Sequence, residues 1–78
     1  MPIIITPHAH ERLVKYRLSA LMVEECVSEP EIITAGNYGR KIAHRRLNGY
    51  VLRVIYEEKG NDIIVITAYK AKVGRYEI

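Results

Sequence analysis

The sequence predicts a small α+β domain in which two N-terminal helices are followed by an antiparallel meander sheet of three or four strands. Three observations support this fold class. A chain of 78 residues is long enough for one hydrophobic core, so residues 1–78 are treated as a single domain. Capping residues and prolines mark two short helices in the first third. The remainder alternates β-branched runs with turn residues, and its Asn48-Gly49 pair is typical of a β-hairpin.

The first helix is predicted from Pro7 to Tyr16. Thr6 is a favourable N-cap, and proline is tolerated at the first helical position because its missing N–H would have no partner there. The preceding apolar run, Ile3–Ile5, fits either a strand or a lead-in to the helix.

A second helix is predicted over residues 20–28. Ser19 is its N-cap, and Glu29 ends it because a residue before proline avoids helical geometry. Cys26 lies among apolar positions of this helix and is expected in the core. As the single cysteine of the chain it forms no internal disulfide, which fits a reducing, cytoplasmic location.

Four β-rich runs follow the helices. They cover residues 32–34, 40–47, 50–57 and 63–70. The register of the last three follows from a two-residue turn at Asn48-Gly49 and a second turn centred on Gly60-Asn61. The pairs that these turns predict include His44 with Arg53, Ala43 with Val54, Val54 with Thr67, and Leu52 with Tyr69.

Alternation along the strands sorts the side chains onto two faces. The more aliphatic face is expected to receive the helices, and it includes Ile42, His44, Arg46, Val51, Arg53, Ile55, Ile64, Ile66 and Ala68. The second face is expected to stay open for a ligand or partner, and it includes Lys41, Ala43, Arg45, Tyr50, Leu52, Val54, Tyr56, Val65, Thr67 and Tyr69. A partner segment or a second copy of the chain would cover its apolar part, namely Leu52, Val54 and Val65.

The charge of the chain is modest, but its distribution is informative. Twelve Lys and Arg residues against nine Asp and Glu residues give a net charge of +3. The bases concentrate in residues 40–53 and 70–75, and the acids in residues 24–31 and 57–58. Such a separation favours a surface that binds phosphates, whereas the alternative is a basic strand that is simply solvated. A membrane partner is not expected, because no apolar run approaches the length of a membrane span.

His8 and Arg12 are the residues of the first helix with chemical potential. Four positions apart, they share a helix face and place a titratable imidazole beside a permanent cation, which suits acid–base chemistry on a phosphate. The alternative is a solvated helix face. His8 and His10 do not form a metal chelate, because residues two apart on a helix point to different sides. No metal or cofactor is therefore expected.

The order and spacing of several motifs resemble a family of small prokaryotic proteins that is known only as a domain of unknown function. The matching segments are His8–Arg12, Arg17–Ser19, Pro30, Gly39-Arg40, Asn48–Tyr56 and Ile64–Ala68. That family is similar to BrnT toxins and, more distantly, to the RelE/ParE toxin superfamily. The segment Ile66–Ala71, followed by Arg75-Tyr76, is similar to the BrnT ending, with Tyr69 at a position where BrnT has arginine.

The resemblance implies a RelE-like fold and metal-independent RNA cleavage by a toxin that a protein antitoxin neutralises. The catalytic candidates are His8, Arg12, Arg45 and Tyr69. The RNA-binding candidates are Lys41, His44, Arg46, Tyr50, Arg53, Lys70 and Arg75. The expected function is thus that of a toxin-like endoribonuclease. The alternative is a non-catalytic RNA-binding or protein-interaction module on the same fold, and a homodimer is compatible with both.

Overall fold

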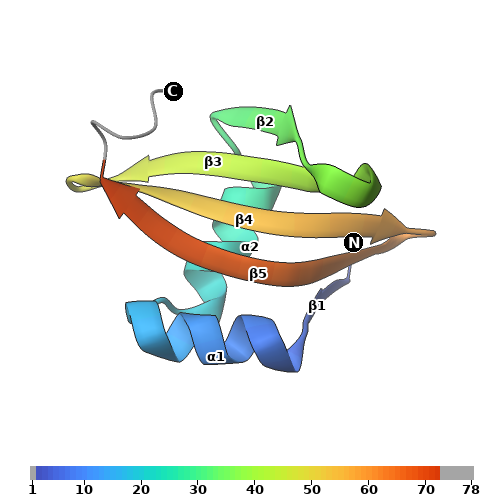
Figure 1. The fold of residues 1–78 in the computed structure, drawn as a ribbon, viewed down its shortest axis with the longest axis horizontal. Coiled ribbons are helices and arrows are strands. Elements are labelled where there is room, and N and C mark those ends of the chain that lie inside the picture. Colours follow the sequence, from blue (N-terminus) through green and yellow to red (C-terminus); the bar gives the residue numbers. More distant parts are fainter. Residues whose placement is uncertain (1, 73–78) are drawn as a thin grey trace.

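The computed structural model describes residues 2–72 and contains two helices and one five-stranded mixed sheet (Figure 1). The elements in chain order are β1 (Ile3–Ile5), α1 (Pro7–Tyr16), α2 (Ala20–Ser28), β2 (Ile32–Ala35), a short 3₁₀ helix η1 (Asn37–Gly39), β3 (Lys41–Leu47), β4 (Tyr50–Lys59) and β5 (Asp62–Lys72). The order of the strands across the sheet is β1-β5-β4-β3-β2. Within these residues, neither helix has the length and apolar character needed to cross a membrane.

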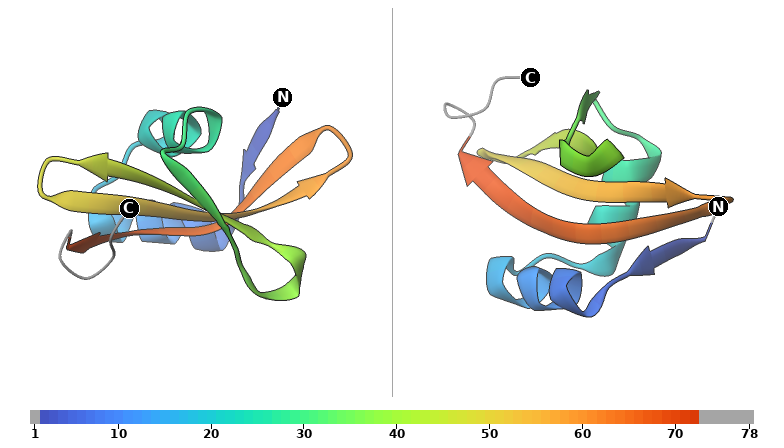
Figure 2. Two further views of the ribbon diagram at one scale, coloured as in Figure 1. Left: turned by 90° about the horizontal axis from the view of Figure 1, so that it is seen from above. Right: turned by 45° about the vertical axis from the view of Figure 1, so that its right-hand side comes forward.

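Both predicted helices and their N-caps are confirmed. The Thr6 hydroxyl accepts a hydrogen bond from the Ala9 amide at the start of α1. The Ser19 hydroxyl accepts one from the Met22 amide at the start of α2. Each cap gives a partner to a backbone N–H that the helix itself leaves unbonded. As Figures 1 and 2 show, α2 crosses one face of the sheet at β3 and β4, whereas α1 runs alongside β5.

The predicted antiparallel meander of three or four strands is wrong. The run Ile3–Ile5 forms a fifth strand, β1, which pairs with β5 in parallel, so that Ile3 lies opposite Ile63 and Ile5 opposite Val65. A parallel pair requires a long crossover, and here both helices and the other three strands lie between the two partners in sequence. Three apolar residues carry too little periodicity to reveal such a distant pairing.

The predicted pairing of β3 with β4 is confirmed. His44 lies opposite Arg53 and Ala43 opposite Val54 across the Asn48-Gly49 turn. Gly49 has a φ of 74° there, a conformation that glycine adopts without the steric cost of a Cβ atom.

The predicted pairing of β4 with β5 holds from the turn to the pair of Tyr56 with Val65, but it is wrong by one residue from Ile55 to Tyr50. Tyr56 pairs with Val65, but Ile55 pairs with Thr67, so Ile66 is the additional residue of a β-bulge. A bulge of this kind reverses the faces of the residues that follow it. Past the bulge, Tyr69 therefore lies opposite Arg53 rather than opposite Leu52.

The helices pack on the face that the sequence predicted to be open. We call this the covered face, and its buried residues include Ala43, Leu52, Val54, Tyr56, Ile63, Val65 and Ala68. The prediction that a partner would cover Leu52, Val54 and Val65 is therefore wrong, since all three are fully buried within the domain. Ala43 and Ala68 explain the arrangement, because small side chains allow the helices to approach the sheet closely. Cys26 is buried in the same core, as predicted.

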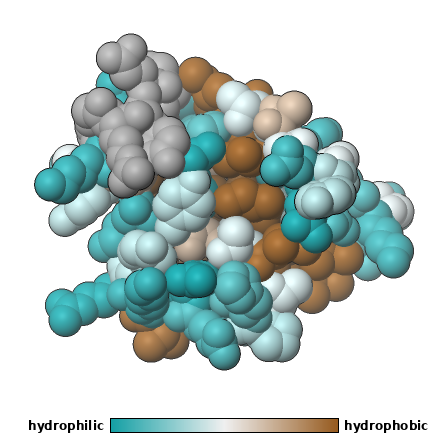
Figure 3. All heavy atoms as spheres, in the orientation of Figure 1, coloured by the Kyte–Doolittle hydropathy of each residue, from teal (hydrophilic) through white to brown (hydrophobic). Residues whose placement is uncertain are grey.

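The opposite side of the sheet has no helix over it in the described part of the chain, and we call it the open face. It carries Ile42, His44, Arg53, Ile55, Thr67 and Tyr69, which alternate with the residues of the covered face or follow the bulge. Figure 3 views the molecule from this side and shows hydrophobic surface in the middle and mostly hydrophilic side chains below it, where α1 lies. Ile32 and Ile33 of the outermost strand β2 are 40% and 50% exposed.

Candidate functional site

The spacing along α1 presents three functional side chains toward β5. His8, Arg12 and Tyr16 follow one another at intervals of four residues and therefore lie on one side of the helix. Ala9 and Leu13 lie on the neighbouring side and are buried in the core, which fixes the rotation of the helix. The first helix therefore displays an imidazole, a guanidinium and a phenol in one row.

The β-bulge supplies the other side of the site. In a regular strand, Thr67 and Tyr69 would share the face of Val65, which is buried beneath the helices. The additional residue Ile66 turns both side chains away from that core. Two polar side chains of β5 thereby lie where the row of α1 residues meets the strand.

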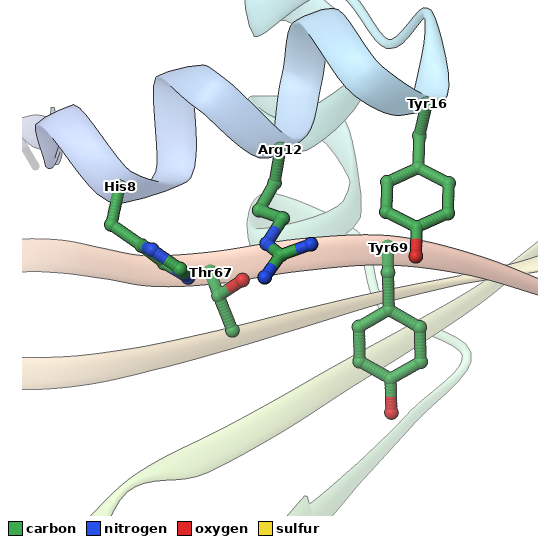
Figure 4. Close-up of a pocket in the computed structure, with 5 residues that line it drawn as sticks. All are labelled: His8, Arg12, Tyr16, Thr67 and Tyr69. Atoms are coloured by element: carbon green, nitrogen blue, oxygen red, sulfur yellow. The ribbon is translucent and has the colours of Figure 1, made fainter.

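These five residues line one pocket of about 280 Å³. Figure 4 shows His8 and Arg12 pointing from α1 toward Thr67 on β5, and the ring of Tyr16 lying above that of Tyr69. His8 is exposed, whereas Arg12, Tyr16, Thr67 and Tyr69 are partly buried. Three of the four predicted catalytic residues, His8, Arg12 and Tyr69, are thus brought together from opposite ends of the chain.

Arg53 and His44 adjoin this pocket across the sheet. Arg53 donates a hydrogen bond to the Tyr69 hydroxyl, and its guanidinium carbon lies 5.3 Å from the centre of the Tyr69 ring. His44, opposite Arg53, is only 7% exposed and has its Nε2 3.0 Å from the Thr34 hydroxyl. Burial, with the nearby positive charge of Arg53, lowers the pKa of His44. A buried neutral imidazole suits packing and hydrogen bonding, whereas His8 is the exposed histidine that lines the pocket.

The fourth predicted catalytic residue, Arg45, does not reach the pocket. It alternates with His44 and Arg46, so its side chain leaves the sheet on the covered face. Its Nη1 donates a hydrogen bond of 2.9 Å to the carbonyl of Glu29, directly after the end of α2. A cation at the C-terminal end of a helix is favourable, because the last carbonyl groups carry partial negative charge. The structure gives Arg45 a role in holding α2 against the sheet.

The other basic residues of β3 are paired with acids. Lys41 forms an ion pair with Glu58, and Arg46 forms one with Glu31 at 3.3 Å. Arg40, just before the strand, pairs with Glu57 at 2.9 Å. The separate basic and acidic halves expected from the sequence are therefore not found in the described residues, because the sheet brings the acids of β4 and of the segment before β2 beside the bases of β3.

Two more predicted RNA-binding residues lie close together but away from the pocket lining. The Lys70 ammonium is 4.8 Å from the centre of the Tyr50 ring, a favourable cation–π arrangement. Neither residue lines the pocket described above. Arg75, the last of the predicted RNA-binding residues, lies outside the described residues, as does Tyr76 of the segment that resembles BrnT.

Sequence reasoning missed two lining residues. Tyr16 is not among the site residues predicted from the sequence, although its interval of four residues from Arg12 would have placed it in the row with His8. Thr67 was placed on the face of Val65, and only the bulge reveals that it lines the pocket. Within residues 2–72, no group of three or more His, Cys, Asp or Glu residues is arranged to hold a metal ion.

Comparison with known proteins identifies a family for the chain but no activity. A family model described as "Domain of unknown function (DUF4258)" matches residues 5–70. This segment contains the whole pocket lining. No curated protein and no solved structure matches the chain significantly.

Proposed function

We propose that this chain, which belongs to the family of the domain of unknown function DUF4258, binds RNA in the pocket between α1 and β5 and cleaves it without a metal ion. The observation that carries the proposal is the convergence of His8, Arg12, Thr67 and Tyr69 from opposite ends of the chain. Their imidazole, guanidinium, hydroxyl and phenol groups suit a phosphodiester. The pocket residues that the structure describes include no carboxylate that would repel one.

Arg12 is the phosphate-binding residue in this proposal. A guanidinium offers several N–H donors in one plane and makes charge-assisted hydrogen bonds to phosphate oxygens. The same donors stabilise the additional negative charge that develops on those oxygens during cleavage, which is a major source of rate acceleration. Arg12 is partly buried at the pocket wall, so its side chain is partly ordered before the ligand binds.

His8 and a pocket phenol share the proton transfers. One group removes the proton of a ribose 2′-hydroxyl, whose oxygen then bonds to phosphorus, and the other returns a proton to the departing 5′-oxygen. The products are a 2′,3′-cyclic phosphate and a free 5′-hydroxyl. The exposed imidazole of His8 suits either step, because imidazole is the side chain that most readily exchanges protons near neutral pH.

Tyr16 and Tyr69 provide aromatic surfaces for the bases that flank the phosphate. Base stacking on such rings is typical of proteins that bind single-stranded RNA. The sequence resemblance to BrnT and RelE/ParE toxins supports the cleavage step. A protein antitoxin and a cytoplasmic location belong to the same proposal.

A second candidate function is RNA binding without cleavage. It is favoured by the small number of groups in the pocket that transfer protons near neutral pH, since His8 is the one imidazole among the lining residues that the structure describes. Tyr69 also favours binding without cleavage, because it stands where BrnT has an arginine and so offers no positive charge to the reacting phosphate.

A cleavage assay in EDTA distinguishes the two functions. A 5′-labelled single-stranded RNA is incubated with the wild-type protein, with His8→Gln and with Arg45→Gln. Cleavage by the wild type and by Arg45→Gln, its loss in His8→Gln, and resistance of a 2′-deoxy analogue support the nuclease. Binding of RNA and of the analogue without cleavage supports the second candidate. Absence of both binding and cleavage in the wild type would overturn the whole proposal.

A further inference from the structure

A row of side chains crosses the open face and ends at the pocket. Backbone register places His44 of β3 opposite Arg53 of β4, and Arg53 opposite Tyr69 of β5. Directly opposite residues on neighbouring strands have Cβ atoms about 5 Å apart, close enough for their side chains to interact. Thr34 of the outermost strand β2 completes the row through its contact with His44. We call these four residues the cross-sheet row.

Contacts at the two ends of the row, joined by the strand register in its middle, lead from the outermost strand to the pocket. The Thr34 hydroxyl lies 3.0 Å from Nε2 of His44. Arg53 follows in the register, and its guanidinium donates to the Tyr69 hydroxyl and lies against the Tyr69 ring. The far end of the Tyr69 side chain is therefore held by β4, although its backbone belongs to β5.

This fixation matters because Tyr69 lines the pocket. A tyrosine ring that is free to rotate loses conformational entropy when a ligand orders it, whereas a ring held beforehand avoids that cost. Burial of His44, with the adjacent Arg53 charge, lowers the pKa of His44, so the imidazole stays neutral near pH 7 and does not repel Arg53. A buried, neutral His44 therefore allows the Arg53 guanidinium to stay beside Tyr69.

We propose that Arg53 is a positioning residue for Tyr69, and that His44 and Thr34 in turn fix Arg53, so that the shape of the pocket depends on side chains reaching back to β2. This inference rests on the proposed function for its effect on RNA. Its structural part, the fixation of Tyr69 by Arg53, is independent of any ligand.

A double-mutant cycle tests the proposal. The affinity of a short single-stranded RNA, in a form that the protein does not cleave (2′-deoxy), is measured for Arg53→Gln, Tyr69→Phe and the double variant. Because both substitutions remove the same hydrogen bond, we expect each to weaken binding about 3- to 10-fold and the double variant to be little weaker than either one. Arg40→Gln is the matched control, since it also removes one positive charge but pairs with Glu57 outside the row. Effects of Arg53→Gln and Tyr69→Phe that multiply in the double variant would overturn the proposal.

A ligand-free measurement separates this inference from the proposed function. The NMR signals of ¹³C-labelled tyrosine rings are recorded for the folded protein alone. We expect the Tyr69 signal to move in Arg53→Gln, to move by a smaller amount in Thr34→Val, and to stay in place in Arg40→Gln. An unmoved Tyr69 signal in folded Arg53→Gln overturns the inference. A moved signal in a protein that binds no RNA leaves the row intact and overturns the proposed function.

Discussion

The hydroxyl of Thr6 donates a hydrogen bond of 2.9 Å to the carbonyl of Val65, which is 59 residues away in the sequence. The same oxygen accepts the Ala9 amide at the start of α1. Val65 directly precedes the bulge residue Ile66, whose carbonyl lies 3.3 Å from the hydroxyl. One side chain therefore connects the beginning of the pocket helix to the bulge that turns Thr67 and Tyr69 into the pocket.

Replacing Thr6 with valine is expected to destabilise the protein. Valine keeps the β-branched shape but removes the cap and the bond to Val65, so the free energy of unfolding should fall by about 1–2 kcal/mol. Urea denaturation followed by circular dichroism measures the change. Thr6→Ser retains the hydroxyl and serves as the control. Equal losses in both variants would show that the hydroxyl does not connect the two elements.

The Cys26 thiol is expected to be unreactive while the protein is folded. Burial raises the pKa of Cys26 to about 12, and the reactive form of cysteine is the thiolate. Labelling with a thiol reagent at pH 8 should be at least about tenfold slower in the native protein than in 6 M urea. Rapid stoichiometric labelling of the native protein would contradict the buried position.

The same thiol makes stability depend on alkaline pH. Because the pKa of Cys26 is raised in the folded state, its contribution to stability is present below about pH 9 and is lost as the pH rises toward 12. The free energy of unfolding of Cys26→Ala should fall less steeply across this window than that of the wild type. Parallel pH profiles for the two proteins would contradict the raised pKa.

The buried His44 is expected to make the folded protein less stable at acidic pH. Burial and the Arg53 charge lower its pKa in the folded state, so the unfolded chain takes up this proton first as the pH falls below about 6.5. The stability present at pH 7.5 should decline toward pH 5 in the wild type and decline less in His44→Gln. His10→Gln, a change at an exposed position of α1, is the control and should follow the wild type. A profile of His44→Gln that parallels the wild type would contradict a buried neutral imidazole.

The parts of the fold that local chemistry determines could be predicted from the sequence. Thr6 and Ser19 indicate where the two helices begin, because their side chains cap the adjacent backbone directly. Asn48-Gly49 fixes the register of β3 and β4 for the same reason. The bulge at Ile66 could not be predicted, because it carries neither glycine nor another local signal, yet it reverses the faces of Thr67 and Tyr69.

Helix spacing and the resemblance to BrnT pointed to three of the five lining residues, whereas the ion pairs between distant elements were missed. His8 and Arg12 share a helix face by spacing alone. The charges of Lys41 and Arg46 were read from their own strand, whereas their acidic partners, Glu58 and Glu31, lie on β4 and before β2. Ion pairs of this kind depend on the strand order, which the linear sequence does not display.

The most direct test of the central claim compares two arginines. Arg12 lines the pocket, whereas Arg45 bonds to the Glu29 carbonyl on the covered face, and replacing either with glutamine removes one positive charge. The affinity of both variants for a single-stranded RNA is measured across a range of salt concentrations. We expect Arg12→Gln to lose about tenfold in affinity and to show a weaker salt dependence, and Arg45→Gln to bind like the wild type. Equal affinities of the two variants would contradict an RNA-binding pocket between α1 and β5.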